Sequence, residues 1–364
     1  MPRNTAPGPR LRAVLDSIPG YRPTEGVYAA IPARPLSANE SPRDPLPGLV
    51  AAIAAAGATV NRYPDPECAE LTREIARRHG VDPDRVLVGA GSVSLLQALI
   101  QAVAEPGAEV VHPWRSFELY PVLAEVAGVR PVPVPLTRGH NDLTALADRI
   151  TEATRLVLVC NPNNPTGTVL GLPELKEFLA RVPATCLVVI DEAYFEYVRD
   201  EAACSGIALL DTHPNLVVTR TFSKAYGLAG LRIGYLLGAP HSVGQLRKVL
   251  LAYSVSTVAQ QAALAALRLE DELLRHVDAT VAERTRMRDT LLAAGFDVPD
   301  SQGNFLWLPL GDVSAAFGDL CTSAGIAVRT YAHEGVRVSV GSAQDNDAFL
   351  TMATRERSTA CTPQ

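Results

Sequence analysis

The sequence predicts an α/β protein with two parts: a large domain built on a mainly parallel sheet flanked by helices, and a smaller α+β domain. At 364 residues the chain is longer than a single hydrophobic core usually serves. Between about residues 49 and 240, apolar β-branched runs alternate with helix-like segments, a pattern typical of a parallel sheet covered on both faces. Beyond this point, long amphipathic helices and three short strand-like runs indicate the second, smaller unit.

The expected elements of the larger unit follow in chain order. Helices are expected at 49–57, 68–80, 92–104 and 118–128. Short strands are expected at 85–91, 109–113, 130–136, 156–162, 186–194 and 215–221. Gly80 is expected to end the second helix and Ser92 to begin the third. Because most of these strands are apolar along their length, both faces of the sheet are expected to be buried.

The smaller unit is expected after about residue 240. Residues 245–294 read as long amphipathic helices. Strand-like runs follow at 304–310, 326–331 and 335–341, with a helix between the first two. We therefore predict an N-terminal arm, 1–36, packing on the small domain, a large domain, 37–248, and a small C-terminal α+β domain, 249–364.

The overall composition argues against several classes of protein. A net charge of −6 argues against a nucleic-acid binder, which would show a basic patch. No apolar run reaches the roughly 18 residues of a membrane span, and the Pro-rich start MPRNTAPGPR lacks the apolar core of a secretory signal. The six cysteines are scattered, without CxxC pairs or histidines at metal spacing. We therefore expect reduced thiols, no metal site and a cytoplasmic location.

Polar residues gather where several expected strands end, which is where open α/β sheets bind ligands. GAGS (89–92) leads into a helix and suits an anion at the free N–H groups of its first turn, although a plain tight turn fits too. NPNNPTG (161–167) places Asn164 in a stiff polar loop, or forms an ordinary proline turn. DEAY (191–194) ends an apolar strand, so Asp191 is expected to be partly buried with a cationic partner, in a ligand site or in a structural ion pair.

The stretch TFSKAYGLAGLRIGY (221–235) sets Lys224 between a strand and a run of glycines. Burial lowers the pKa of a lysine from about 10.4 and makes its amine a nucleophile toward carbonyls, unless the side chain reaches solvent. An anion-binding turn, an amide, a buried acid, a reactive lysine and a nearby arginine, Arg232, together match the needs of pyridoxal 5′-phosphate. That cofactor requires a Schiff-base lysine, a carboxylate at its pyridine nitrogen, donors to its ring oxygen and a phosphate clamp.

These motifs resemble, in order and distance, those of the fold-type I aminotransferases, which depend on pyridoxal 5′-phosphate. NRYPDP (61–66) and GVRVSVG (335–341) also fit, so the resemblance covers nearly the whole chain. It points to the histidinol-phosphate/aromatic aminotransferase subgroup. HPWRSFELYP (112–121) and VRTY (328–331) look closest to its aromatic (phenylalanine) aminotransferases, with Trp114 and Phe117 in place of the aromatic pair common in histidinol-phosphate enzymes.

The resemblance implies a role in cofactor binding for each matching residue. Lys224 would bind the cofactor as a Schiff base and shuttle a proton, while Asp191 would pair with the pyridine nitrogen. Tyr194 and Asn164 would hydrogen-bond the ring oxygen, and Phe117 would stack on the ring. The phosphate would be held by Gly91, Ser92, Thr221, Ser223 and Arg232.

The same resemblance implies substrate residues and a partner subunit. Arg337 would bind the anionic group of the substrate, and Arg329 would bind a second anion. Tyr21 and Asn39 would face the substrate from the N-terminal segment. Tyr63 would reach the phosphate of the neighbouring subunit, which implies a homodimer with shared active sites.

The resemblance implies an enzyme that moves the amino group of an aromatic L-amino acid, phenylalanine or tyrosine, to a 2-oxo acid such as 2-oxoglutarate by ping-pong chemistry. A histidinol-phosphate aminotransferase of histidine biosynthesis is the alternative, with Arg329 and Arg337 holding the phosphate. A decarboxylase of a phosphorylated amino acid shares the fold. A pyridoxal-binding regulator would need an added DNA-binding domain, and a nicotinamide dehydrogenase would need a third glycine in its turn; neither is evident.

Overall fold

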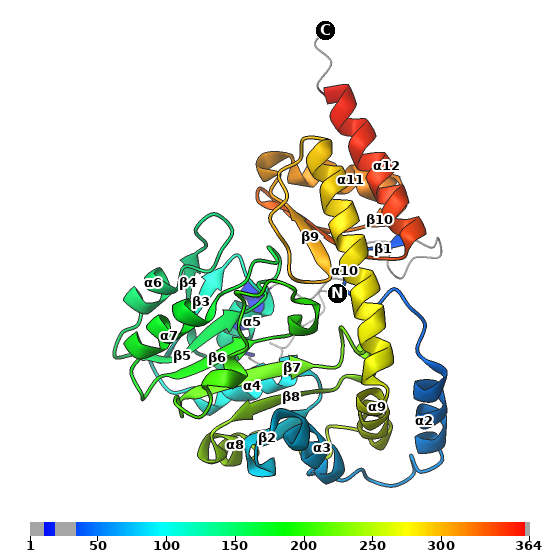
Figure 1. Cartoon of the computed structure of the whole chain (residues 1–364). Helices are drawn as coiled ribbons and strands as arrows, with labels where there is room; N and C mark the ends of the chain where they lie inside the picture. Colours follow the sequence, from blue (N-terminus) through cyan, green and yellow to red (C-terminus); the bar gives the residue numbers. More distant parts are fainter. Residues whose placement is uncertain (1–10, 19–33, 361–364) are drawn as a thin grey trace, which may run out of the picture.

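A seven-stranded sheet forms the centre of the larger body (Figure 1). The computed structural model describes residues 11–18 and 34–360. The strands of this sheet are β2 (Val86–Gly89), β3 (Glu109–Trp114), β4 (Arg130–Pro135), β5 (Thr154–Cys160), β6 (Leu187–Asp191), β7 (Leu216–Thr221) and β8 (Gly234–Gly238). Their order is β2-β8-β7-β6-β5-β3-β4, with β8 antiparallel to β2 and β7 and the other neighbours parallel. The predicted α/β class with a mainly parallel sheet is confirmed; β8, which is short and has glycine at both ends, is not among the predicted strands.

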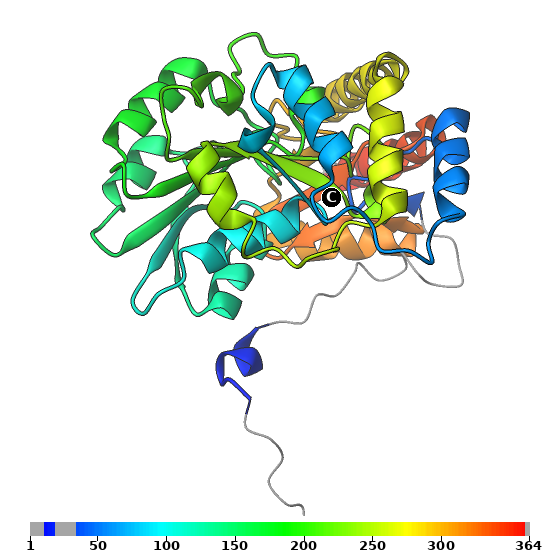
Figure 2. The ribbon, with the colours of Figure 1, turned by 90° about the horizontal axis from the view of Figure 1, so that it is seen from below.

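Helices cover both faces of this sheet (Figures 1 and 2). They are α2 (Pro47–Gly57), α3 (Ala69–His79), α4 (Ser92–Ala102), α5 (Leu119–Ala127), α6 (Leu143–Asp148), α7 (Leu172–Arg181), α8 (Pro240–Leu246) and α9 (Thr257–Arg268). Successive residues of a strand point to opposite faces, so each strand feeds two apolar cores. In β6, Val188 and Ile190 belong to the core that also contains residues of α2, α3, α6, α7 and α9, whereas Val189 belongs to the core that contains residues of α4, α5 and α8.

A three-stranded antiparallel sheet, in the order β11-β12-β9, belongs to the smaller body. Its strands are β9 (Phe305–Leu308), β11 (Arg329–Tyr331) and β12 (Gly335–Ser339), and the helices around it are α10 (Glu270–Ala293), α11 (Ser314–Ser323) and α12 (Ala343–Ala360). A third apolar core, which includes Phe296, Phe317 and Phe349, fills this body. The predicted short strands and the helix between the first two are therefore present. Figure 1 shows α10 running from the larger body to the smaller one.

The described part of the N-terminal arm contacts both bodies. β1 (Arg34–Pro35) pairs in parallel with β10 (Ile326–Ala327) of the smaller body. α1 (Val14–Ser17) lies instead against α5 of the larger body. In the predicted arm 1–36, residues 34–35 therefore pack on the smaller body, as predicted, whereas α1 packs on the larger body. Residues 1–10 and 19–33 lie outside the described ranges.

Helix α9 belongs to the larger body by its packing. Figures 1 and 2 both show it beside α2, and Ala262 on its buried face joins the first core. The predicted boundary at 248/249 would separate this helix from that core. In α10, Leu273 contributes to the first core and Leu291 to the core of the smaller body. We therefore propose that the domain boundary lies within α10 rather than at 248/249.

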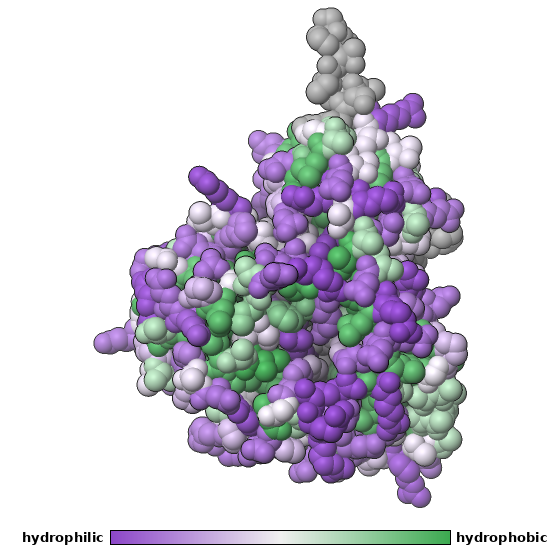
Figure 3. Space-filling view, in the orientation of Figure 1, coloured by the Kyte–Doolittle hydropathy of each residue, from purple (hydrophilic) through white to green (hydrophobic). Residues whose placement is uncertain are grey.

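The surface and the thiols add two observations. Figure 3 shows polar side chains over much of one face, with paler, apolar surface over α2 at the lower right. Within residues 11–18 and 34–360, no helix combines the length and the apolar character that a bilayer crossing requires. In the same ranges, no group of three or more His, Cys, Asp or Glu is placed to hold a metal ion. Five described cysteines are free thiols: Cys68, Cys160, Cys186, Cys204 and Cys321.

Candidate active site

A cavity of about 560 Å³ is lined by residues of both bodies. It lies beyond the ends of β5, β6 and β7, whose last residues are close together because these neighbouring strands are parallel. The predicted site residues that line it are Ser92, Phe117, Asn164, Asp191, Tyr194, Thr221, Ser223, Lys224, Arg232, Arg329 and Arg337. The structure therefore brings together residues that are up to 245 positions apart in the sequence, 92 to 337.

Lys224 lies on the cavity wall just beyond the end of β7. Its Nζ donates to the carbonyl oxygen of Ala38 (2.8 Å) and lies 5.8 Å from the centroid of the Tyr194 ring. Burial, and then the positive charge of Arg337, lowers the pKa of Lys224 to about 7. A large fraction of its amine is therefore neutral near pH 7, and the neutral amine is the form that attacks a carbonyl carbon.

Covalent labelling of Lys224 in the cofactor-free protein is expected to follow this lowered pKa. The neutral amine reacts, so the labelling rate should rise with pH, pass half of its plateau near pH 7 and level off above it. Peptide mapping after timed exposure to an amine-directed reagent separates Lys224 from Lys176 and Lys248, the other two lysines of the chain. A midpoint near 10.4, the value of a free lysine side chain, would show that the cavity does not change the acidity of Lys224.

Asp191 is the last residue of β6 and is buried at the floor of the cavity. Its Oδ1 accepts a hydrogen bond from Thr219 Oγ1 (3.0 Å), and its Oδ2 accepts one from Tyr120 Oη (3.1 Å). Burial raises the pKa of Asp191 to about 6, although these two hydrogen bonds favour the ionised form. A cation placed beside this carboxylate would hold it ionised, which suits a protonated ring nitrogen.

One end of the cavity is built to receive an anion. Helix α4 begins at Ser92, and Gly91 before it has φ +82°, so backbone N–H groups at the start of this helix are available to a ligand. Arg232 Nη1 donates to Ser223 Oγ (3.2 Å), and Thr221 Oγ1 accepts from the backbone N–H of Ser223 (3.1 Å). The cavity wall thus contains the guanidinium of Arg232, the hydroxyls of Thr221 and Ser223, and the start of α4 at Ser92. This combination of donors suits a phosphate.

Gly91 is expected to be required for this anion site. A Cβ at this position would lie 2.6 Å from Arg232 Nη2, and the positive φ disfavours a side chain. Gly91→Ala should therefore displace Arg232 and weaken binding of the phosphorylated cofactor by about tenfold or more, since a charge-assisted hydrogen bond contributes roughly 1.5–3 kcal/mol. Fluorescence titration of the cofactor-free protein measures this. Gly230→Ala is the matched control, because Gly230 also lines the cavity and its added Cβ would meet nothing within 4 Å; equal affinities of the two variants would contradict the prediction.

The cavity wall also carries two of the predicted substrate residues, Arg337 and Arg329. Arg337 Nη1 donates to Asn164 Oδ1 (2.7 Å), and its Nη2 donates to the carbonyl oxygen of Ser37. Arg329 Nη2 donates to both carboxylate oxygens of Glu118 (2.6 and 2.7 Å). Both guanidinium groups line the cavity, so each is within reach of a ligand held there.

Of the predicted site residues that the structure describes, Gly91, Asn39 and Tyr63 are not among those that line the cavity. Asn39 is fully buried; its Nδ2 donates to Tyr194 Oη (3.0 Å) and its Oδ1 accepts from Ser339 Oγ (2.8 Å). These two bonds link Asn39 to Ser339 and to Tyr194, which lines the cavity; that Asn39 faces the substrate stays a prediction. Tyr63 is 83% exposed and packs against Tyr253, with ring centroids 4.8 Å apart. Tyr21 lies outside the described residues.

Sequence reasoning missed several residues that complete the site. Tyr120 and Thr219 hold the carboxylate of Asp191, and Glu118 neutralises Arg329. The position of Tyr120 in the first turn of α5, just after Phe117, was an available signal. The two rings are in edge contact, 5.6 Å between centroids. The contact of Ala38 with Lys224 runs through a backbone carbonyl, for which no side-chain signal exists.

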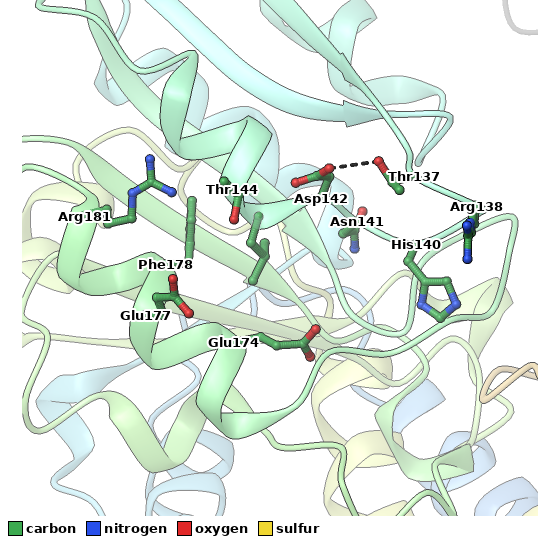
Figure 4. Close-up of a pocket in the computed structure, with 11 residues that line it drawn as sticks. Thr137, Arg138, His140, Asn141, Asp142, Thr144, Glu174, Glu177, Phe178 and Arg181 are labelled. Atoms are coloured by element: carbon green, nitrogen blue, oxygen red, sulfur yellow. Dashed lines mark hydrogen bonds between the residues drawn. The ribbon is translucent and has the colours of Figure 1, made fainter.

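A second pocket, of about 310 Å³, lies apart from these residues (Figure 4). It is lined by side chains of both charges from the segment 137–144 and from α7. Figure 4 shows the hydrogen bond in which Thr137 donates to Asp142 (2.8 Å). Asn141 Nδ2 donates to the carbonyl oxygen of Cys160 (2.9 Å), which ties this segment to the end of β5. None of the predicted site residues lines this pocket, so it does not form part of the candidate site.

Comparison with known proteins identifies the family of this chain. The family model described as aminotransferase class I and II matches residues 34–352. The chain belongs to this aminotransferase family. A Thermobifida fusca protein named aromatic amino acid aminotransferase is 55% identical to this aminotransferase over 346 residues, which cover 95% of this chain and 96% of that protein. A Streptomyces coelicolor protein of the same name is 50% identical over 347 residues, which cover 95% and 97%.

Solved structures agree with this family. The histidinol-phosphate aminotransferase of Sinorhizobium meliloti, solved with pyridoxal 5′-phosphate, is similar to this aminotransferase with a TM-score of 0.89 and 29% identity. The match covers 98% of this chain and 100% of that one. Family membership and this neighbour imply pyridoxal 5′-phosphate as the cofactor of this aminotransferase, and an amino acid and a 2-oxo acid as its substrates.

Proposed function

We propose that this aminotransferase transfers the amino group of an aromatic L-amino acid, phenylalanine or tyrosine, to a 2-oxo acid such as 2-oxoglutarate. The observation that carries this proposal is the cavity wall, which contains Phe117, Leu119 and Tyr331 as well as Arg337. An apolar, aromatic wall suits a flat side chain, and a guanidinium suits the α-carboxylate. The names of relatives that are 50–55% identical over nearly the whole chain support the same substrate class.

The residues of the cavity fit pyridoxal 5′-phosphate. Lys224 offers a partly neutral amine, Asp191 a buried carboxylate, and Arg232 with the start of α4 an anion site. The space beside Arg232 exists because Gly91 lacks the Cβ that would fill it. When bound, this cofactor supplies an electrophilic carbon and an electron-withdrawing ring.

The chain's own residues would then perform three tasks. The amine of Lys224 would hold the cofactor, and, once released by the incoming substrate, would carry the proton that leaves the substrate Cα. The carboxylate of Asp191 would keep a proton on the ring nitrogen, because a buried anion favours the charged partner. The fork of Arg337 would bind the substrate α-carboxylate through two parallel hydrogen bonds.

A histidinol-phosphate aminotransferase is the second candidate, and one observation favours it. Two arginines, Arg329 and Arg337, line the same cavity, which is the number of cations that a phosphate dianion would attract. The fold shared with the histidinol-phosphate aminotransferase of Sinorhizobium meliloti is compatible with both candidates.

We also propose a homodimer in which Tyr63 reaches the active site of the partner. Tyr63 is 83% exposed and packs against Tyr253, and Val60 and Leu251, each close in sequence to one of these two tyrosines, are 68% and 81% exposed. Several exposed apolar side chains in one region suit an interface with a second subunit. The apolar surface over α2 lies in this region (Figure 3). Sedimentation equilibrium of the cofactor-loaded protein measures the state directly, and a monomer at micromolar concentration would contradict the proposal.

The substrate proposal is tested by single-turnover reactions of the cofactor-loaded enzyme. Phenylalanine, tyrosine and histidinol phosphate are added separately at equal concentrations, without an acceptor, and the 2-oxo product is quantified. We expect the aromatic amino acids to react with a kcat/KM at least about a hundredfold higher than that of histidinol phosphate, which corresponds to about 2.7 kcal/mol. Faster reaction of histidinol phosphate would assign the enzyme to the second candidate.

A further inference from the structure

Two arginines of the cavity face each other across a pair of antiparallel strands. Arg329 on β11 is directly opposite Arg337 on β12, and both side chains line the cavity. Directly opposed residues of an antiparallel pair have Cβ atoms about 4.5–5.5 Å apart, and like charges at such positions repel each other. Something must therefore offset one or both of these charges.

The two guanidinium groups are offset differently. Arg329 forms a bidentate salt bridge with Glu118, whose two oxygens lie 2.6 and 2.7 Å from Nη2. Arg337 donates to neutral acceptors only among its recorded hydrogen bonds, the amide oxygen of Asn164 and the carbonyl oxygen of Ser37. Its Nε is buried without a partner, and within residues 11–18 and 34–360 no carboxylate forms a salt bridge with it. Arg337 is therefore the guanidinium with positive charge still available to a ligand.

We propose that Glu118 is a specificity-determining residue that disfavours substrates with a second anionic group, by neutralising Arg329. This inference rests on the proposed function, because it concerns the side-chain end of the substrate. Glu118 follows Phe117 directly and precedes Leu119, and all three line the cavity. The carboxylate therefore lies beside the apolar wall on which an aromatic side chain would rest.

The consequence follows from the charges on this wall. An aromatic amino acid carries one carboxylate, which would bind Arg337. Its ring would lie against a wall on which the charge of Arg329 is neutralised by Glu118. A substrate with a phosphate or a second carboxylate would place that anion near Glu118, and to reach Arg329 it would have to displace a bidentate salt bridge. Like charges at close range are unfavourable at a partly desolvated site, so a second anion, including that of 2-oxoglutarate, binds more weakly than it would beside an unpaired Arg329.

A second ion pair provides a matched control. Arg115 on the larger body and Glu334 on the smaller one also form a bidentate salt bridge, with Nε to Oε2 at 2.8 Å. This pair, like Glu118 and Arg329, joins the two bodies. Neither Arg115 nor Glu334 lines the cavity. Loss of the Arg115–Glu334 pair thus weakens the contact between the bodies without changing the charge that a substrate meets.

The test compares Glu118→Gln with Glu334→Gln in the cofactor-loaded enzyme. Glutamine keeps the size of glutamate and removes its charge. The ratio of kcat/KM for histidinol phosphate to kcat/KM for phenylalanine should rise at least about tenfold in Glu118→Gln and stay within about twofold of the parent in Glu334→Gln. By the same reasoning, the KM for 2-oxoglutarate should fall in Glu118→Gln.

A binding measurement separates this inference from the proposed function. Glutarate carries a carboxylate at each end, whereas 3-phenylpropionate carries one carboxylate and a ring. Calorimetry should show the affinity ratio of glutarate to 3-phenylpropionate rising at least about tenfold in Glu118→Gln alone. If the parent enzyme did not react with phenylalanine, the proposed function would fail, while the calorimetric ratio would still decide the role of Glu118. An unchanged ratio in Glu118→Gln, or an equal change in Glu334→Gln, would overturn the inference.

Discussion

Replacement of Lys224 with alanine is expected to abolish transamination and covalent attachment of the cofactor. Lys224 has a partly neutral amine, and among the described residues that line the cavity it is the one lysine. Removing the group that both holds the cofactor and moves the proton should lower kcat by at least about 10⁴-fold. Single-turnover kinetics with phenylalanine measure the residual rate, and mass spectrometry after borohydride reduction measures attachment.

The same substitution is expected to leave the fold intact. The pKa of Lys224 is about 7 in the folded protein and near 10.4 in an unfolded chain, so the unfolded state binds more protons between these values. At pH 7 the lysine therefore opposes folding, and the free energy of unfolding of the cofactor-free Lys224→Ala variant should equal or exceed that of the parent. Lys248→Ala serves as the control for activity. Transamination at the parent rate in Lys224→Ala would refute the mechanism.

Replacement of Asp191 with asparagine is expected to lower kcat by about 10²–10³-fold while the cofactor stays bound. Asparagine keeps the shape of the side chain but cannot supply the negative charge that holds a proton on the ring nitrogen. Tyr120→Phe is the graded comparison: it removes one hydrogen bond to Asp191 Oδ2 and leaves the charge, so its loss should stay below about tenfold. Single-turnover rates of both variants, with the bound cofactor quantified, test whether Asp191→Asn loses more activity than Tyr120→Phe. An unchanged rate in Asp191→Asn would remove this carboxylate from the reaction.

Local signals predicted most of the larger body. Gly80 ends α3 in a left-handed conformation, φ +66°, and Ser92 begins α4, as their residue types indicate. The apolar runs that became β5, β6 and β7 are continuous because these strands are buried on both faces. Their ends carry the polar residues that line the cavity. Sequence order alone thus placed Asp191, Thr221 and Lys224 at one edge of the sheet.

The features that the sequence did not predict depend on contacts between distant segments. The salt bridge between Glu118 and Arg329 joins residues 211 positions apart. Asn39 is hydrogen-bonded both to Tyr194 and to Ser339 from the smaller body. The packing of α9 on α2 was hidden because an alanine-rich amphipathic helix fits either body equally well by its pattern. In each case tertiary packing decided what local propensity leaves open.

The central claim, that Lys224 is the residue that holds the cofactor, is tested most directly by peptide mapping. The cofactor-loaded protein is reduced with borohydride, digested, and the modified peptides are identified by mass spectrometry. The chain contains three lysines, Lys176, Lys224 and Lys248, so the outcome is unambiguous. The account predicts one cofactor per chain, on the peptide that contains Lys224. Attachment at Lys176 or Lys248, or no attachment in a catalytically active preparation, would contradict it.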